Sequence, residues 1–236
     1  MRSIVTPIPA AVLLSCIVSA TPVITGIDRD RTPEGAQSGV QQIDLVQQLS
    51  VGKLRPVNRL VSALAGTPGA VTVAEKADNG VVWINGTDFA QGTIEVDIRG
   101  RDVQGRSFVG IAFHRKDDES YEAVYLRPFN FRTTDPARHQ HAVQYVALPE
   151  FDWPRLRQDF PEEFENPVDA SVEPTGWVPL RVTVKPTTVQ IFVGKVTSPT
   201  LEVRKLGRLE RGQVGLWTGN GSDGAFANLR IGPARD

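Results

Sequence analysis

Residues 121–132 (YEAVYLRPFNFR) combine aromatic, cationic and amide side chains in a strand-like pattern. In a strand every second side chain points to the same face, so the two tyrosines and the first arginine share one face, opposite Val124 and Leu126. A tyrosine ring with a polar tip, beside the donor fork of an arginine, suits the CH patches and hydroxyl groups of a sugar. The alternative is an exposed strand of ordinary β-formers, because tyrosine has a high strand propensity. We predict that this segment contributes ligand-binding residues, namely Tyr121, Tyr125, Arg127, Asn130 and Arg132.

A second polar run, residues 138–145 (RHQHAVQY), contains two of the three histidines. In a strand, His139 and His141 would share a face, as a pair of metal ligands does. Two ligands do not complete a site, so we predict no metal site and no cofactor, and a divalent cation stays open as the alternative. If this run pairs with a strand at 120–127, it adds to the ligand-binding set His141, Gln144 and Tyr145.

Glu95 and Asp97 form the clearest pair of carboxylates in the chain. On one strand face their side chains stand ~7 Å apart along the strand, whereas retaining glycoside hydrolysis needs carboxyl groups about 5–5.5 Å apart. Glucanases of glycoside hydrolase family 16 carry a third acid shortly after such a pair, and here Arg99 and Gly100 follow instead. The sequence therefore favours a solvated outer face at this pair.

Two aromatic segments outside the strands also carry candidate ligand contacts. Residues 149–176 form a long irregular stretch that contains Trp153, and we expect it to pack down as an ordered cover over part of one sheet. Trp217 opens a Gly-rich run, where it either stacks on a sugar or plugs the end of the fold. We include Trp153 in the predicted ligand-binding set.

The elements that must position these residues are short strands. Residues 93–99 (TIEVDIR) alternate apolar and polar side chains without a break. Residues 177–185 repeat the pattern and predict a hairpin with residues 189–193. Inward-facing positions there are Val178, Leu180, Val182 and Val184, and outward-facing ones are Arg181, Thr183 and Lys185. Further strands are expected at 80–85, 107–115, 120–127, 140–148, 200–206, 212–218 and 225–231, whereas 43–50 reads as either a helical turn or an edge strand.

Several strand motifs resemble those of known families. The segments in question are FAQGTIEVDIRG (89–100), WVPLRVTV (177–184), VQIFV (189–193), GQVGLW (212–217) and FANLRI (226–231). They are similar to strands of concanavalin A-like lectin/glucanase and laminin G-like domains. Over residues 65–232 the pattern looks most like the bacterial keto-disaccharide hydrolase-type domain. The resemblance implies an all-β, two-sheet antiparallel jelly-roll sandwich, a fold that hosts lectins, glucanases, lyases and adhesion modules.

The N-terminus reads as a targeting segment. Residues 9–20 (PAAVLLSCIVSA) are apolar or small, but the run is shorter than the ~20 residues of a membrane span, and its small-residue ending fits signal peptidase. We predict a signal peptide at 1–20, a flexible linker at 21–42 and one domain at 43–236, in a protein exported to the periplasm or the exterior. A lipoprotein anchored through Cys16, the single cysteine, is the less favoured alternative.

Composition limits the partners. The chain has 26 Lys and Arg against 27 Asp and Glu residues, so no basic excess points to nucleic acid. We predict a carbohydrate partner and no membrane span, and the sequence does not specify the oligomeric state.

Three classes of function fit this sequence. The favoured one is a glycan-binding module, and the others are a glycoside-cleaving hydrolase or lyase and a structural adhesion domain. The enzyme hypothesis takes its acid, base and charge-stabilising groups from Glu122, Arg127, His141 and Glu150. It requires Glu122, Arg127 and His141 to converge in one pocket.

Overall fold

The computed structural model describes residues 39–234. The predicted signal peptide, Cys16 and most of the predicted linker lie outside these residues. Among the described residues, no helix has the length and apolar character needed to cross a membrane.

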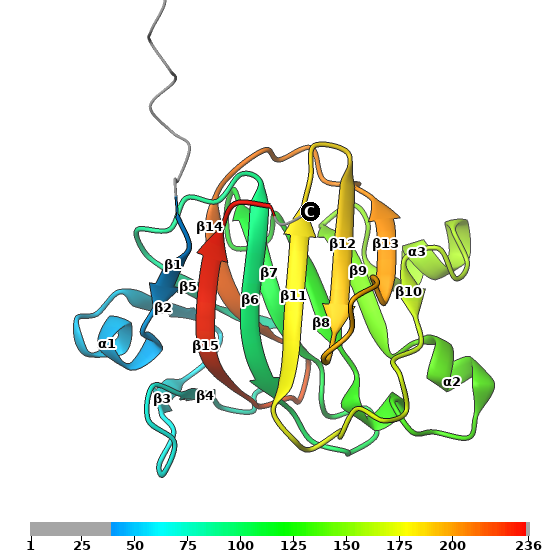
Figure 1. The fold of residues 1–236 in the computed structure, drawn as a ribbon, viewed down its shortest axis with the longest axis horizontal. Coiled ribbons are helices and arrows are strands. Elements are labelled where there is room, and N and C mark those ends of the chain that lie inside the picture. The colour runs from blue at the N-terminus through cyan, green and yellow to red at the C-terminus, as the bar shows by residue number, and fades with distance from the viewer. Residues whose placement is uncertain (1–38, 235–236) are drawn as a thin grey trace, which may run out of the picture. The chain divides into compact units, whose positions relative to one another are not determined.

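Two antiparallel sheets stack face to face, which confirms the all-β sandwich fold (Figure 1). One is an eight-stranded sheet in the order β13 (Leu201–Arg204), β12 (Thr188–Val193), β11 (Val178–Val184), β6 (Gly92–Arg99), β15 (Gly224–Gly232), β4 (Val71–Val73) and β3 (Val61–Ala63), with β1 (Gln41–Ile43) also pairing with β15. The other is a seven-stranded sheet in the order β10 (Glu165–Asn166), β9 (Val143–Leu148), β8 (Tyr121–Leu126), β7 (Val109–Arg115), β14 (Gln213–Thr218), β5 (Gly80–Ile84) and β2 (Leu54–Val57).

The core lies between the sheets and is built by the predicted alternation. In β6 the buried apolar side chains are Ile94, Val96 and Ile98, and in β11 the buried residues include the four predicted inward positions. Thr183 differs from the expectation, because it is buried although it points away from the core. Its hydroxyl oxygen lies 3.2 Å from that of Thr93, its cross-strand partner, and the two hydroxyl groups share one hydrogen bond.

The N-terminal part of the domain contains a helix and short strands that the alternation of apolar and polar residues did not predict. Helix α1 (Leu45–Ser50) begins at the N-cap Asp44, whose carboxylate accepts the backbone N–H of Gln47. Gln41 and Gln42, which we had placed in the linker, instead belong to β1 and pair with β15. Strands β1, β2 and β3 are short and lie at sheet margins, where the pattern of apolar residues is weakest.

Strand β9 begins three residues later than predicted. Asp135 and Pro136 start helix α2 (Pro136–Gln140), because the aspartate caps the first backbone N–H groups and the proline fixes the first helical residue. His139 therefore lies in the helix and His141 at its C-cap. The prediction that the two histidines share a strand face is wrong.

The long stretch 149–176 is ordered, as expected. It forms helix α3 (Trp153–Asp159), capped by Asp152, and then β10, which pairs with β9 at the edge of the seven-stranded sheet. Buried Leu156, Phe164 and Val168 anchor this stretch to the domain.

Candidate ligand-binding site

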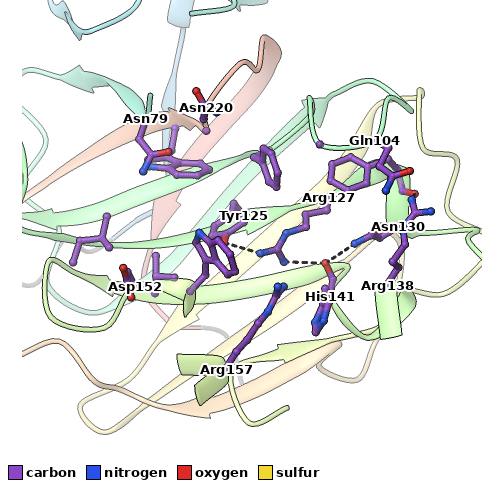
Figure 2. A pocket seen from close by; sticks show the side chains of 18 residues that line it. Asn79, Gln104, Tyr125, Arg127, Asn130, Arg138, His141, Asp152, Arg157 and Asn220 are labelled. Carbon is purple, nitrogen blue, oxygen red and sulfur yellow. Dashed lines mark hydrogen bonds between the residues drawn. The ribbon is translucent and has the colours of Figure 1, made fainter. Parts of the chain in front are cut away.

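A pocket of about 540 Å³ lies on the outer face of the seven-stranded sheet (Figure 2). This volume falls within the range of about 300–1,000 Å³ that is typical of small-molecule sites. Its walls come from α3, the 3₁₀ helix η1 (Pro128–Asn130) and several loops. The lining residues are Asn79, Gln104, Gly105, Phe108, Tyr125, Arg127, Phe129, Asn130, Arg138, His141, Val146, Leu148, Asp152, Trp153, Arg157, Trp217, Gly219 and Asn220.

Strand alternation explains why β8 reaches this pocket. A side chain at Gly224 in the eight-stranded sheet would meet Val109, and Val109 pairs with Leu126. Leu126 therefore faces the other sheet, whereas Tyr125 and the alternate residues of β8 face outward. The predicted facing of Tyr121 and Tyr125, opposite Leu126, is confirmed, but both tyrosines are buried because loops cover this face.

The floor of the pocket is a pair of stacked aromatic rings. The ring centroids of Tyr125 and Trp217 lie 4.7 Å apart at an interplanar angle of 29°. Gly110 lies on β7, the strand between β8 and β14, and pairs with both Tyr125 and Trp217. A Cβ atom at Gly110 would come within 2.7 Å of the Tyr125 Cβ atom, so the glycine makes this close packing possible.

Arg127 is the central cation of the pocket and is almost fully buried. Its Nη2 donates to the Tyr125 hydroxyl at 2.9 Å and to the Gln144 Oε1 at 2.7 Å, and its Nη1 donates to the His141 carbonyl at 2.9 Å. The guanidinium also stacks 4.8 Å above the Tyr125 ring centroid. Burial lowers the pKa of Arg127, yet an arginine in a protein keeps its charge.

Glu165 supplies the carboxylate that balances this charge. It is buried, and Arg157 binds both of its oxygens through Nε and Nη2, with Nη2 at 2.9 Å. His141 Nδ1 lies 2.7 Å from Glu165 Oε1, and Arg127 Nη1 lies 3.9 Å from Oε2. Burial lowers the pKa of His141 against the opposing effect of Glu165, so its imidazole is neutral at pH 7.

Two buried amide atoms beside the pocket lack a protein partner among the described residues. The Asn130 side-chain nitrogen donates to the His141 carbonyl at 3.2 Å, which leaves its Oδ1 as a free acceptor. The Gln144 Oε1 accepts from Arg127 and Tyr125, which leaves its Nε2 as a free donor. Buried polar atoms are costly unless they find water or a ligand.

Five of the residues predicted for ligand binding line the pocket, namely Tyr125, Arg127, Asn130, His141 and Trp153. Two more contact pocket residues without lining the pocket themselves. The Gln144 side chain accepts a hydrogen bond from Arg127, and the Tyr121 hydroxyl accepts one of 3.2 Å from the Trp217 indole N–H. The predicted pairing of the strand that contains Tyr125 with the strand that contains Gln144 is confirmed, because these two residues of β8 and β9 stand opposite each other.

Arg132 and Tyr145 are corrections to the predicted set. Arg132 bonds to Glu173 at 2.8 Å and does not line the pocket. Tyr145 follows Gln144 directly, so it points to the opposite face of the strand. There it is buried and donates its hydroxyl proton to Glu122.

The catalytic candidates do not converge. Glu122 lies on the inner face with Tyr145, 2.8 Å from His114 Nδ1 and 3.3 Å from Lys205 Nζ. His114 is fully buried in this cluster. Glu150 is exposed beside Arg155, outside the pocket. Only Arg127 and His141 of the enzyme set share the cavity.

The carboxylates Glu95 and Asp97 belong to the other sheet. Both are partly exposed on strand β6, on the face away from the core, as expected. Asp97 accepts a hydrogen bond of 2.7 Å from Asn228. Within residues 39–234, no group of three or more His, Cys, Asp or Glu side chains is arranged to hold a metal ion.

Sequence reasoning missed much of the pocket wall. The residues missed include Phe108, Phe129, Arg138 and Arg157. They lie in loops and short helices, where no simple sequence period shows which way a side chain points. Trp217 carried the one usable signal, an aromatic residue beside a Gly-rich run.

No protein-family model matches the chain, and no curated protein matches its sequence. Among solved structures, the carbohydrate-binding module CBM66 from Bacillus subtilis is similar with a TM-score of 0.54 and 14% identity, over 76% of this chain and 95% of that one. A protein of unknown function with a galectin-like fold, also from Bacillus subtilis, gives a TM-score of 0.55 and 12% identity, over 85% and 98%. These likenesses confirm the two-sheet jelly-roll sandwich fold.

Proposed function

We propose that this chain is an exported glycan-binding module whose ligand occupies the pocket on the seven-stranded sheet. The observation that carries the proposal is the combination of an aromatic floor, Tyr125 and Trp217, with a buried arginine and the unpartnered amide oxygen of Asn130 in one cavity. Sugars present apolar CH faces and hydroxyl groups close together, and such a cavity matches both. The fold is also that of the similar carbohydrate-binding module.

Each part of the pocket has a role in this proposal. Trp153 is half exposed at the rim and offers a ring on which a sugar can stack. Asn130 Oδ1 accepts a hydroxyl proton, and Arg127 holds the floor rigid through its bonds to three neighbours. We expect dissociation constants between about 1 mM and 1 μM, or roughly −4 to −8 kcal/mol.

A binding module fits the geometry better than a glycosidase. Glycosidases need an acid and a second carboxylate that both reach the sugar. Glu122 lies on the other face of the sheet, and Glu165 is occupied by Arg157 and His141. The resemblance of the strand motifs to the keto-disaccharide hydrolase-type domain therefore supports a related fold more than a shared reaction.

The proposal is tested by isothermal titration calorimetry against a panel of plant and bacterial oligosaccharides. We expect at least one to bind, and Trp153→Ala to weaken that binding about tenfold. The matched control is Trp177→Ala, which removes a tryptophan that contacts Arg99 outside the pocket. Absence of binding across the panel, or equal loss in both variants, contradicts the proposal.

A further inference from the structure

The charges around the pocket are unevenly matched. Arg127, Arg138 and Arg157 line it, and among the described residues Asp152 is its one lining carboxylate. Glu165 adds a second negative charge from behind the wall, where it is held by Arg157. Three guanidinium groups thus face two carboxylates, one of which lies outside the cavity.

Arg138 is the pocket arginine whose positive charge is least compensated by carboxylates. It donates one hydrogen bond of 3.2 Å, from Nη2 to the Phe129 carbonyl. Within residues 39–234, no carboxylate oxygen forms an ion pair with it. An arginine carries five N–H donors in a planar fork, so most of the donors of Arg138 remain for a ligand or solvent.

The cationic groups gather on one side of the cavity. Figure 2 shows Arg138 and Arg157 along one wall, on either side of the neutral His141, with Arg127 between them and the opposite wall. Asn79 and Asn220 lie across the cavity from them, and Gln104 lies near the end that holds Asn130. Guanidinium groups therefore lie on one side of the pocket and amide side chains on the other, and Asp152 is the one carboxylate among its described lining residues.

We propose that the ligand of this pocket is an acidic glycan, whose sugar carries a carboxylate or a sulfate group. The anionic group binds at the wall of Arg138 and Arg157, and the sugar hydroxyls face the amide wall. An arginine fork matches the paired oxygens of such anions and forms short, charge-assisted hydrogen bonds with them. This inference rests on the proposed function, since it names the class of glycan that the same pocket binds.

The test compares ligands that differ only in charge. Calorimetry uses oligogalacturonate against its carboxyl-reduced counterpart, and sulfated against desulfated galactan oligosaccharides, at low and high NaCl. We expect a charged member of one pair to bind at least tenfold more tightly than its neutral counterpart, with an affinity that falls as salt rises. The pair that shows the difference identifies the anionic group as carboxylate or sulfate.

Arg138→Gln removes the charge in the protein instead. It should weaken binding of the charged ligand about tenfold and that of its neutral counterpart much less, whereas Arg138→Lys should retain part of the affinity for the charged ligand. Arg132→Gln is the matched control, because that arginine pairs with Glu173 outside the pocket. Melting temperatures establish that each variant is folded, and if Arg138→Gln does not fold, the paired ligands decide alone.

The outcomes separate this inference from the proposed function. Equal affinity for charged and neutral members of both pairs, with binding insensitive to salt, overturns the acidic-glycan inference and leaves the glycan-binding module standing. A failure to bind any oligosaccharide, charged or neutral, overturns both.

Discussion

Glu165→Gln should destabilise the domain strongly, because it removes the buried negative charge that holds the pocket wall together. The Glu165 side chain is 2% exposed and lies within ion-pair distance of Arg157, His141 and Arg127. Breaking a buried ion pair from one side costs about 3–5 kcal/mol, because the partner charge stays desolvated. Arg157 is 29% exposed and can turn partly toward water, so we expect the lower end, about 3 kcal/mol.

The control is Glu173→Gln, which breaks an exposed pair with Arg132 whose side chains are 57% and 46% exposed. Such surface pairs contribute about 0–1 kcal/mol. Urea unfolding at pH 7.5 should give a clearly lower midpoint for Glu165→Gln, with an unchanged slope, and a midpoint near that of the unmodified protein for Glu173→Gln. In a domain of this size the first change corresponds to a melting temperature lowered by roughly 6–12 °C. Equal midpoints for the two variants would refute the role assigned to Glu165.

Three further predictions concern the fold and its dependence on pH. Val182→Asp places an unpaired carboxylate in the core and should prevent folding, whereas Arg181→Ala on the outer face should change the melting temperature little; similar circular dichroism melts would contradict this. Gly110→Ala should cost about 3 kcal/mol, since the new methyl group would clash with the Val124 carbonyl oxygen and the Tyr125 backbone, while Gly176→Ala, whose nearest contact is the exposed Glu173 side chain, should cost much less in the same urea assay. Burial lowers the pKa of His141 in the folded state, so the unfolded state takes up the proton first, and the free energy of unfolding should fall as pH drops below about 6.5. His141→Gln should reduce this fall in unfolding experiments between pH 5 and pH 8, and an identical pH profile in both proteins would contradict the assignment.

Strand alternation made much of the fold predictable from the sequence. It correctly predicted the inward residues of β6 and β11, and it placed Tyr125 of β8 and Arg127, which directly follows this strand, on the side of the pocket. The same rule would have excluded Tyr145, because neighbours in a strand point to opposite faces, and Gln144 already occupied the outer one.

The walls of the pocket were not predictable in this way. Phe108, Arg157 and Asn220 come from segments far apart in the chain, and only the tertiary fold brings them together. Helix α2 was missed because the polar run 138–145 was read as strand, although Asp135 and Pro136 carry a helix start signal. The burial of Glu122 depends on Lys205 and His114 reaching it from other strands and loops, which no local pattern shows.

The most direct test of the glycan-binding pocket uses the four tryptophans as reporters. In a two-dimensional NMR titration with the tightest-binding oligosaccharide of the panel, each indole N–H gives its own signal. Trp153 and Trp217 line the pocket, whereas Trp177 contacts Arg99 away from it. We predict that the signals of Trp153 and Trp217 shift on saturation while that of Trp177 stays in place. A shift of Trp177 with Trp153 and Trp217 unchanged would place the ligand elsewhere and contradict the account.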